Sequence, residues 1–293
     1  MPKKIAVCIG QNNYDPSTGV SPLRGCVNDA LLIGEMLRFA GFGIIRQVHN
    51  EAATQEGILE RASTEVAKLR SGDYFVLWNS SHGYQIQDRS GDELIDGLDE
   101  AITSYDTDPR NPLTDDKFAQ IISRAHPESF IFFASDSCHS GTLSKADLEK
   151  KGENYRKPRL WIPPDDILFR TGKPVLDLGR YMKGIARREV PKLKVRNFGR
   201  LGKDTESMNH LFLSGCLPEE VSWDAKFDEG FHGAMTYNFT KAVLNAWSKK
   251  KAISYSEAHK TAIQGLKKGK FQQSPQLEGQ EKLKNSPVFG VKF

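Results

Sequence analysis

The sequence lacks three features, and each absence excludes a class of protein. No apolar run approaches the roughly 18–20 residues that a membrane-spanning helix needs, so we expect no membrane span. The N-terminal residues lead directly into a strand-like pattern without an apolar signal core, which predicts a chain that is not secreted. The four cysteines are widely spread and form no CxxC pair, which argues against a disulfide framework or a zinc site. Free thiols and a cytoplasmic location fit this composition best.

An excess of charge of one sign is also absent. The 293 residues include 41 basic and 37 acidic side chains, and a formal charge of +4 is too small to indicate binding to nucleic acid or to a membrane surface. A glycine-rich phosphate loop is missing from residues 10–14, directly after the first predicted strand. This argues against a ligand-binding α/β protein of the flavodoxin type.

Short apolar runs alternate with helical patterns along most of the chain. Such alternation is typical of βαβ units and predicts an α/β fold with a mostly parallel sheet. The expected strands cover residues 3–10, 43–48, 74–78, 129–134, 211–213 and 287–291. The expected helices cover residues 26–40, 54–70, 114–125, 231–248 and 256–266, with Thr54 capping the second.

Residues 142–207 interrupt this alternation. They are rich in Lys, Arg, Gly and Pro and show weak periodicity, which predicts a long, partly ordered linker. A loop of this length is uncommon inside a domain unless it is functional.

Two polar clusters follow predicted strands, and they hold the candidate catalytic residues. One contains His82 and the other contains Cys138. The carboxyl ends of parallel strands meet at one edge of the sheet, where open α/β sheets form their sites. A thiol becomes a good nucleophile when a neighbouring base accepts its proton, and caspases place that His about 50 residues before the Cys. The pattern predicts Cys138 as nucleophile and His82 as base.

Other histidines and cysteines offer alternatives. His139 could compete as the base, but adjacent residues on a strand or loop point apart, which favours His82. Cys8, Cys26 and Cys216 are expected to be buried packing residues, the usual role of a lone cysteine.

A series of short motifs occurs in order from residue 5 to about residue 290, with the linker left out. They are Arg24–Ala30 (RGCVNDA), Ser81–Gly83 (SHG), Asp96–Glu100 (DGLDE), Leu113–Asp116 (LTDD), Asp136–Gly141 (DSCHSG), Leu213–Cys216 (LSGC), Gly233–Thr236 (GAMT) and Ser274–Leu277 (SPQL). In these motifs the sequence resembles the type I metacaspases and related bacterial caspase-like peptidases of peptidase family C14.

The resemblance implies a caspase-hemoglobinase fold, with a mostly parallel central sheet flanked by helices on both faces. It implies one peptidase domain over residues 1–293. Within it, residues 1–145 would be the large-subunit-like part, residues 146–206 a linker or insertion, and residues 207–293 the small-subunit-like part.

The resemblance also implies an activity: hydrolysis of proteins or peptides after Arg or Lys. His82 and Cys138 match the catalytic dyad, and the backbone N–H groups of Gly83 and Cys138 match the oxyanion hole. The pocket for the basic side chain would comprise Asp29, Ser80 and Asp136. Two carboxylates that face one pocket repel each other unless a cation lies between them, so an Asp substrate would be rejected.

Calcium is the cofactor that the resemblance suggests. Asp99, Asp115 and Asp116 resemble the acidic residues of the family's calcium site, and carboxylates suit this hard cation. The family's fourth carboxylate position holds Lys145 here, with Asp147 two positions further on. A lysine in a ligand position should weaken the site, and Asp115 and Asp116 could instead serve only at the start of a helix.

Alternatives remain open for what activates the protein and for whether it is an enzyme. The activator could be a partner protein or a small signalling molecule in bacterial defence, or the fold could serve as a non-catalytic scaffold. If the chain cuts itself, we expect the cut between Lys145 and Lys203, after a Lys or Arg. The same segment could instead lie uncut across the pocket or be a structural insertion. Candidate residues for the cut include Lys150, Lys151, Arg156, Arg159, Arg187 and Arg188.

Overall fold

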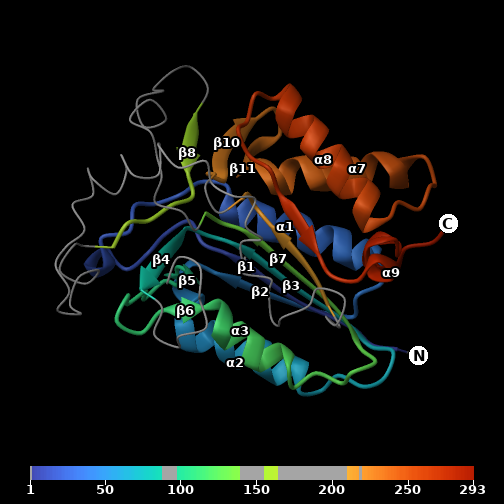
Figure 1. Cartoon of the computed structure of the whole chain (residues 1–293), viewed down its shortest axis with the longest axis horizontal. Coiled ribbons are helices and arrows are strands. Elements are labelled where there is room, and N and C mark those ends of the chain that lie inside the picture. Colours follow the sequence, from blue (N-terminus) through green and yellow to red (C-terminus); the bar gives the residue numbers. More distant parts are fainter. Residues whose placement is uncertain (1, 88–97, 139–154, 164–209, 218–219) are drawn as a thin grey trace, which may run out of the picture.

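The computed structural model describes residues 2–87, 98–138, 155–163, 210–217 and 220–293. A central six-stranded sheet has the strand order β12-β9-β7-β3-β1-β2 (Figure 1). All neighbouring strands run parallel except the edge strand β12, which is antiparallel to β9. The strands are β1 (Lys4–Gly10), β2 (Ile44–His49), β3 (Tyr74–Ser80), β7 (Phe130–Asp136), β9 (His210–Ser214) and β12 (Gln276–Glu278).

Helices cover both faces of the sheet. Figure 1 shows α1, α7 and α8 on one side and α2 and α3 on the other. Their bounds are α1 (Cys26–Phe39), α2 (Gln55–Val66), α3 (Asp115–Ile122), α7 (Ala234–Ser248) and α8 (Tyr255–Lys268), with a short α9 (Glu281–Lys284) near the C-terminus. Single 3-10 turns occur at Pro16–Thr18, Asn50–Ala52 and Val288–Gly290. The architecture confirms the predicted α/β fold with a mostly parallel sheet.

Side-chain alternation along the strands explains why two helical layers form. Trp78 and Phe132 pack with the residues of α1, α7 and α8, whereas Phe75 and Phe133 pack with those of α2 and α3. Successive residues of a strand point to opposite faces, so a strand that is apolar at every position must be covered on both sides.

Two small three-stranded sheets lie beside the main one. The first has the order β4-β5-β6 and the second has the order β11-β10-β8. Their strands are β4 (Gly83–Gln87), β5 (Leu98–Ile102), β6 (Leu113–Thr114), β8 (Arg156–Pro158), β10 (Trp223–Phe227) and β11 (Gly230–Gly233). The sequence analysis predicted none of these strands, because each is short and is paired with residues distant in the sequence or across a loop.

Most predicted elements agree with the structure, and the side chain of Thr54 caps α2 by accepting a hydrogen bond from the Gly57 N–H. The predicted strand over residues 287–291 is wrong. That segment forms a 3-10 turn in which Phe289 has a φ of 53°, a left-handed conformation outside the β region. The predicted helix over residues 231–248 starts too early, because residues 231–233 belong to β11.

The predicted division of the chain at residues 145/146 and 206/207 stays a prediction, since both boundaries lie outside the described residues. One part of the predicted linker, residues 155–163, is described, and it passes directly over the carboxyl edge of the sheet.

Strand register sets that edge. Gly10, Ser80 and Asp136 are neighbours across β1, β3 and β7, and each is the last residue of its strand. Ser135 pairs with Ser214 at the end of β9. Residues far apart in the sequence are therefore brought side by side at one edge, as the placement of the polar clusters predicted.

Candidate active site

An acidic pocket lies at this edge, between the end of the sheet and the start of α1. Asp29, in the first turn of α1, accepts a hydrogen bond of 3.0 Å from the Ser80 hydroxyl. Asp136 ends β7, and all three side chains are fully buried. The structure thus brings together Asp29, Ser80 and Asp136, the three residues expected to form the pocket for a basic side chain.

The guanidinium of Arg159 occupies this pocket. Its Nη2 lies 2.7 Å from Asp29 Oδ2 and 3.1 Å from Asp224 Oδ1, while Nη1 donates to the Asp136 carbonyl oxygen at 2.9 Å. Nη1 also lies 3.5 Å from the Asp136 carboxylate. Arg159 has 0% of its surface exposed, which is rare for an arginine unless its charge is paired.

Electrostatics explains this burial. Removal from water would by itself lower the pKa of Arg159, but Cys26 and the carboxylates of Asp136, Asp29 and Asp224 outweigh it and hold that pKa well above its usual value. Burial raises the pKa of Asp224, and Arg159 acts against that rise. Three buried carboxylates in one pocket repel each other, so a cation between them stabilises the arrangement.

The walls of the pocket fix the carboxylates in place. Asp136 accepts hydrogen bonds from the Thr236 N–H at 2.9 Å, from the Thr236 hydroxyl at 2.7 Å and from the Ser222 hydroxyl. Asp29 accepts from the Gly233 N–H, and His232 Nδ1 lies 3.0 Å from its Oδ1. A Cβ atom at Gly233 would come within 2.5 Å of Arg159 Nη1, so glycine at this position leaves room for the guanidinium.

The carbonyl group of Arg159 is held as well. Its oxygen accepts hydrogen bonds from the Gly83 N–H at 2.9 Å and from the Cys138 N–H at 3.2 Å. These are the two N–H groups that the resemblance implies for an oxyanion hole. Such a pair of donors would stabilise negative charge developing on that oxygen during attack by a nucleophile.

The backbone around Arg159 is bound in extended form. The Arg159 N–H donates to the Ser222 carbonyl oxygen, and the Trp161 N–H donates to the Gly83 carbonyl oxygen, both at 2.9 Å. Upstream, β8 pairs antiparallel with β10. An added strand held by main-chain hydrogen bonds is a common way to bind a peptide.

Cys138 lies beside this segment and is fully buried. Its Sγ accepts a hydrogen bond of 3.1 Å from the Ser222 N–H, lies 3.2 Å from the Glu220 carbonyl oxygen and is 3.9 Å from Cys216 Sγ. Cys8 and Cys26 are buried in packed positions, and burial raises the pKa of Cys8 to about 12. Cys138 is therefore the cysteine that lies against the bound backbone.

His82 is fully buried at the end of β3. Its Nε2 lies 2.8 Å from the Ser21 carbonyl oxygen, an acceptor, so Nε2 carries the proton and Nδ1 has a free lone pair. Among the described residues, Nδ1 has no hydrogen-bond partner. Burial lowers the pKa of His82 to about 3; the backbone groups of Ser21 and Arg159 oppose this shift, and the positive charges of Lys157 and Arg159 add to it. His82 is thus neutral with Nδ1 available as a base.

No hydrogen bond joins His82 to Cys138, both of which the structure describes. Catalytic hydrogen bonds are often loose before the reacting complex forms, so this geometry is compatible with a dyad. His139, the alternative base, lies outside the described residues.

The acidic residues expected to bind calcium lie on neighbouring elements. Asp99 is on β5, and Asp115 and Asp116 begin α3. Among the described residues, no three His, Cys, Asp or Glu side chains are grouped so that they could hold a metal ion. Lys145 and Asp147 lie outside the described residues. The described donors do not form a complete metal site, and we assign no catalytic step to calcium.

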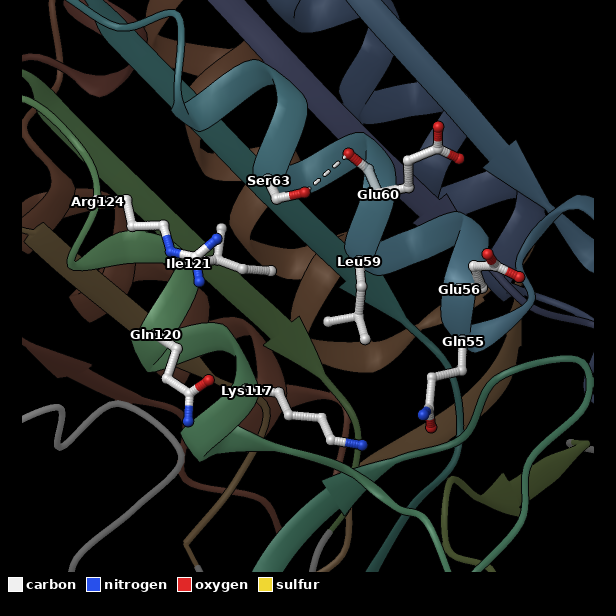
Figure 2. Close-up of a pocket in the computed structure, with 9 residues that line it drawn as sticks. All are labelled: Gln55, Glu56, Leu59, Glu60, Ser63, Lys117, Gln120, Ile121 and Arg124. Carbon is white, nitrogen blue, oxygen red and sulfur yellow. Dashed lines mark hydrogen bonds between the residues drawn. The ribbon is translucent and has the colours of Figure 1, made fainter.

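A hollow also lies between α2 and α3, on the face of the sheet that these two helices cover (Figure 2). Its lining mixes Glu56 and Glu60 with Lys117 and Arg124 and contains neither cysteine nor histidine. Figure 2 shows these charged groups spread along the two helices rather than converging on one point. The edge with Arg159 is therefore the better candidate active site.

Four participants were missed by the sequence analysis: Ser21 as partner of His82, Asp224 and Ser222 in the pocket wall, and Arg159 as its occupant. Asp224 and Ser222 lie on or beside β10, a strand too short to predict, and Ser21 acts through a backbone carbonyl that carries no sequence signal. Arg159 was one of many basic linker residues, and nothing in the sequence distinguishes it from the others.

Comparison with known proteins supports the same class of site. A family model described as Caspase domain matches residues 3–285. The chain therefore belongs to the caspase domain family, peptidase family C14, whose members are cysteine-type peptidases, as the motifs predicted.

Several curated relatives are metacaspases. Metacaspase-8 of Arabidopsis thaliana is 35% identical over 191 residues, which cover 62% of this chain and 49% of that protein. Metacaspase-1 of Meyerozyma guilliermondii is 27% identical over 296 residues, covering 94% of this chain and 69% of that protein. The chain thus spans about half the length of the first of these relatives.

Among solved structures, protein GSU0716 from Geobacter sulfurreducens matches with a TM-score of 0.68 over 100% of both chains at 24% identity. This likeness shows the fold alone. Separately, none of the helices in the described part of the chain is long and apolar enough to cross a membrane.

Proposed function

We propose that this protein is a cysteine endopeptidase that cleaves after Arg, and after Lys less efficiently, with Cys138 and His82 as its dyad. The observation that carries the proposal is the binding of Arg159. Its side chain fills an acidic pocket, its carbonyl oxygen accepts from two backbone N–H groups, and Cys138 lies alongside. A peptide substrate with a basic residue before the scissile bond would occupy the same contacts.

The proposed reaction begins with rotation of the Cys138 thiol away from Ser222 toward the bound carbonyl carbon. His82 Nδ1 accepts the thiol proton, and the sulfur forms a bond to that carbon. The negative charge that develops on the carbonyl oxygen is stabilised by the N–H groups of Gly83 and Cys138; loss of one such donor typically costs about 3–4 kcal/mol. His82 then gives the proton to the leaving amine, and water hydrolyses the thioester to release the acid.

The positions of the pocket acceptors favour arginine. Nη1 and Nη2 have different partners, so a planar guanidinium with two forked donors uses the pocket fully. The single ammonium of lysine cannot reach both sets of acceptors, and an Asp side chain would meet buried carboxylates.

The test is a set of three peptides that differ only in the residue before the scissile bond. We expect kcat/KM for the Arg peptide to exceed that for the Lys peptide by about tenfold, since charge-assisted contacts are lost, and we expect no cleavage of the Asp peptide. Initial rates over a range of peptide concentrations give these values. Faster cleavage of the Asp peptide than of the Arg peptide would contradict the acidic-pocket assignment.

We also propose that the chain cuts itself between Arg159 and Leu160. In the intact chain the segment around Arg159 fills the pocket and lies over Cys138, so other substrates cannot enter. Hydrolysis of this bond would release the new end that begins at Leu160 and allow the segment to leave. Of the residues predicted for a cut, Lys150, Lys151, Arg187 and Arg188 lie outside the described residues. Of the two that are described, Arg156 and Arg159, it is Arg159 whose contacts support this proposal.

Calcium is proposed as a stimulator on the basis of Asp99, Asp115 and Asp116. Because Lys145 replaces a carboxylate, we expect the response at millimolar rather than micromolar calcium. Peptidase rates measured against calcium concentration should rise in the wild type and stay flat in Asp115→Asn combined with Asp116→Asn. Wild-type activity that a chelator leaves unchanged would remove calcium from the proposal.

A further inference from the structure

We propose that the active site also recognises an arginine at the fourth position before the scissile bond, three residues before the arginine at which cleavage occurs. The subsite consists of the Phe271 ring and the carbonyl oxygens of Gly269 and Lys270. This inference rests on the proposed endopeptidase function, and it defines the substrate class more narrowly.

Arg156 shows how such a side chain is bound. Its Nη1 donates to the Lys270 carbonyl oxygen at 2.9 Å, and its Nη2 donates to the Gly269 carbonyl oxygen at 2.8 Å. The guanidinium carbon lies 4.1 Å from the centre of the Phe271 ring. One cation is thus held by two acceptors in its plane and by an aromatic face, which matches a flat guanidinium better than a compact ammonium.

The end of α8 explains why these acceptors attract a cation. Gly269 caps the C-terminus of α8, where the last carbonyl groups have no partner within the helix and the helix dipole is negative. The nearby Lys267, Lys268 and Lys270 side chains are exposed, so water screens their repulsion. The carbonyl oxygens, in contrast, contact the guanidinium directly.

The aromatic wall of the subsite is held in position. Phe271 is 8% exposed and belongs to a buried cluster that includes Leu266 and Trp223. A Cβ atom at Gly269 would come within 2.9 Å of the Phe271 ring, so glycine lets the ring pack against the helix end. The subsite is therefore built by Gly269, Lys270 and Phe271, which are held by the fold, and not by the bound segment itself.

Strand register fixes the spacing between this subsite and the acidic pocket. In the β8–β10 ladder, Arg156 pairs with Ala225 and Pro158 pairs with Trp223, and Arg159 follows directly. A peptide that adds to β10 in the same register places its fourth residue before the cut against Phe271 and its last residue before the cut in the acidic pocket.

The experiment compares two peptides that copy residues 155–161, one with arginine and one with citrulline at the position of Arg156. Citrulline keeps the shape of the side chain and removes its charge. In the wild type we expect kcat/KM to be about tenfold lower for the citrulline peptide, because a charged hydrogen bond pair and a cation–π contact are lost. This comparison needs no variant and so does not depend on folding.

Two variants locate the effect. In Phe271→Leu, which keeps an apolar side chain at that site, we expect the preference for the arginine peptide to fall to about threefold or less, as the aromatic face is lost. The matched control Phe39→Leu changes an exposed phenylalanine on α1 and should keep the full preference. Thermal unfolding curves check that both variants are folded.

The outcomes separate the subsite from the proposed function. Equal kcat/KM values for the two peptides in the wild type would show that the Arg156 contacts only hold the chain's own segment, which overturns the subsite. A wild type that cuts neither its own chain nor any peptide with arginine before the scissile bond would instead overturn the endopeptidase function itself. A preference that is unchanged in Phe271→Leu would remove Phe271 from the subsite.

Discussion

Cys138→Ala is expected to lose all measurable peptidase activity and to remain one intact chain, while the wild type is cut after Arg159. Replacing a residue that forms the covalent intermediate lowers turnover by about 10⁴-fold or more in comparable hydrolases. The same loss is expected for His82→Ala, because no described side chain other than His82 offers a buried, neutral ring nitrogen without a partner beside the bound segment. Mass spectrometry of the incubated proteins identifies the fragment ends, and circular dichroism checks the fold.

Cys8→Ala is the matched control for this experiment. Cys8 is buried in β1 and packs in the core, so its replacement removes a thiol without touching the candidate site. We expect it to keep self-cleavage and peptide turnover, with at most a modest loss of stability. A folded Cys138→Ala protein with full activity would contradict the proposed dyad. An intact wild-type chain that cleaves added peptides would show that the segment leaves the site without being cut.

Replacing the carboxylates of the acidic pocket is also expected to cause a large loss of peptidase activity. We expect both Asp29→Ala and Asp136→Ala to lower kcat/KM for an arginine peptide by at least 10²-fold, since breaking a buried ion pair leaves uncompensated charge and costs about 3–5 kcal/mol. Asp136→Ala should lose more activity. Its carboxylate also holds Thr236 and Ser222 and lies two residues before Cys138, so its removal disturbs the nucleophile as well.

The control for this pair is Asp73→Asn at the opposite end of the sheet. Asp73 is also buried, and it accepts hydrogen bonds from the N–H groups of Lys3 and Arg70. The Asp73→Asn substitution should lower the midpoint of thermal unfolding but keep kcat/KM for the arginine peptide within about twofold of the wild-type value. The reason is position: Asp73 lies just before β3, whereas the candidate site lies just after the other end of that strand. If Asp29→Ala and Asp136→Ala cleaved the arginine peptide as fast as this control, the pocket would not bind the basic side chain.

The alternative of a non-catalytic scaffold makes a different prediction for the same proteins. A scaffold would bind the segment around Arg159 in the wild type and in Cys138→Ala alike, and neither chain would be cut. The cysteine experiment therefore decides between the two functions without a further variant.

The sequence by itself determined the layers of the fold. Apolar strands with residues alternating between two faces require helices on both sides, and the strand ends located His82, Ser80 and Asp136 at one edge. These are local patterns, readable over five to fifteen residues. The resemblance to metacaspases then gave roles to residues whose chemistry alone left their use open, such as Asp29.

Only the tertiary structure decided what fills the site. Asp224 and Arg159 come from segments with weak local patterns, and their meeting depends on strand pairing across sequence distances that no local pattern encodes. The same limit explains the wrong strand at residues 287–291: the Phe289 N–H donates to the Tyr255 hydroxyl, and this long-range contact accompanies a left-handed backbone in an apolar run. Local propensity cannot foresee such contacts, because their free energy comes from partners that only the folded chain brings together.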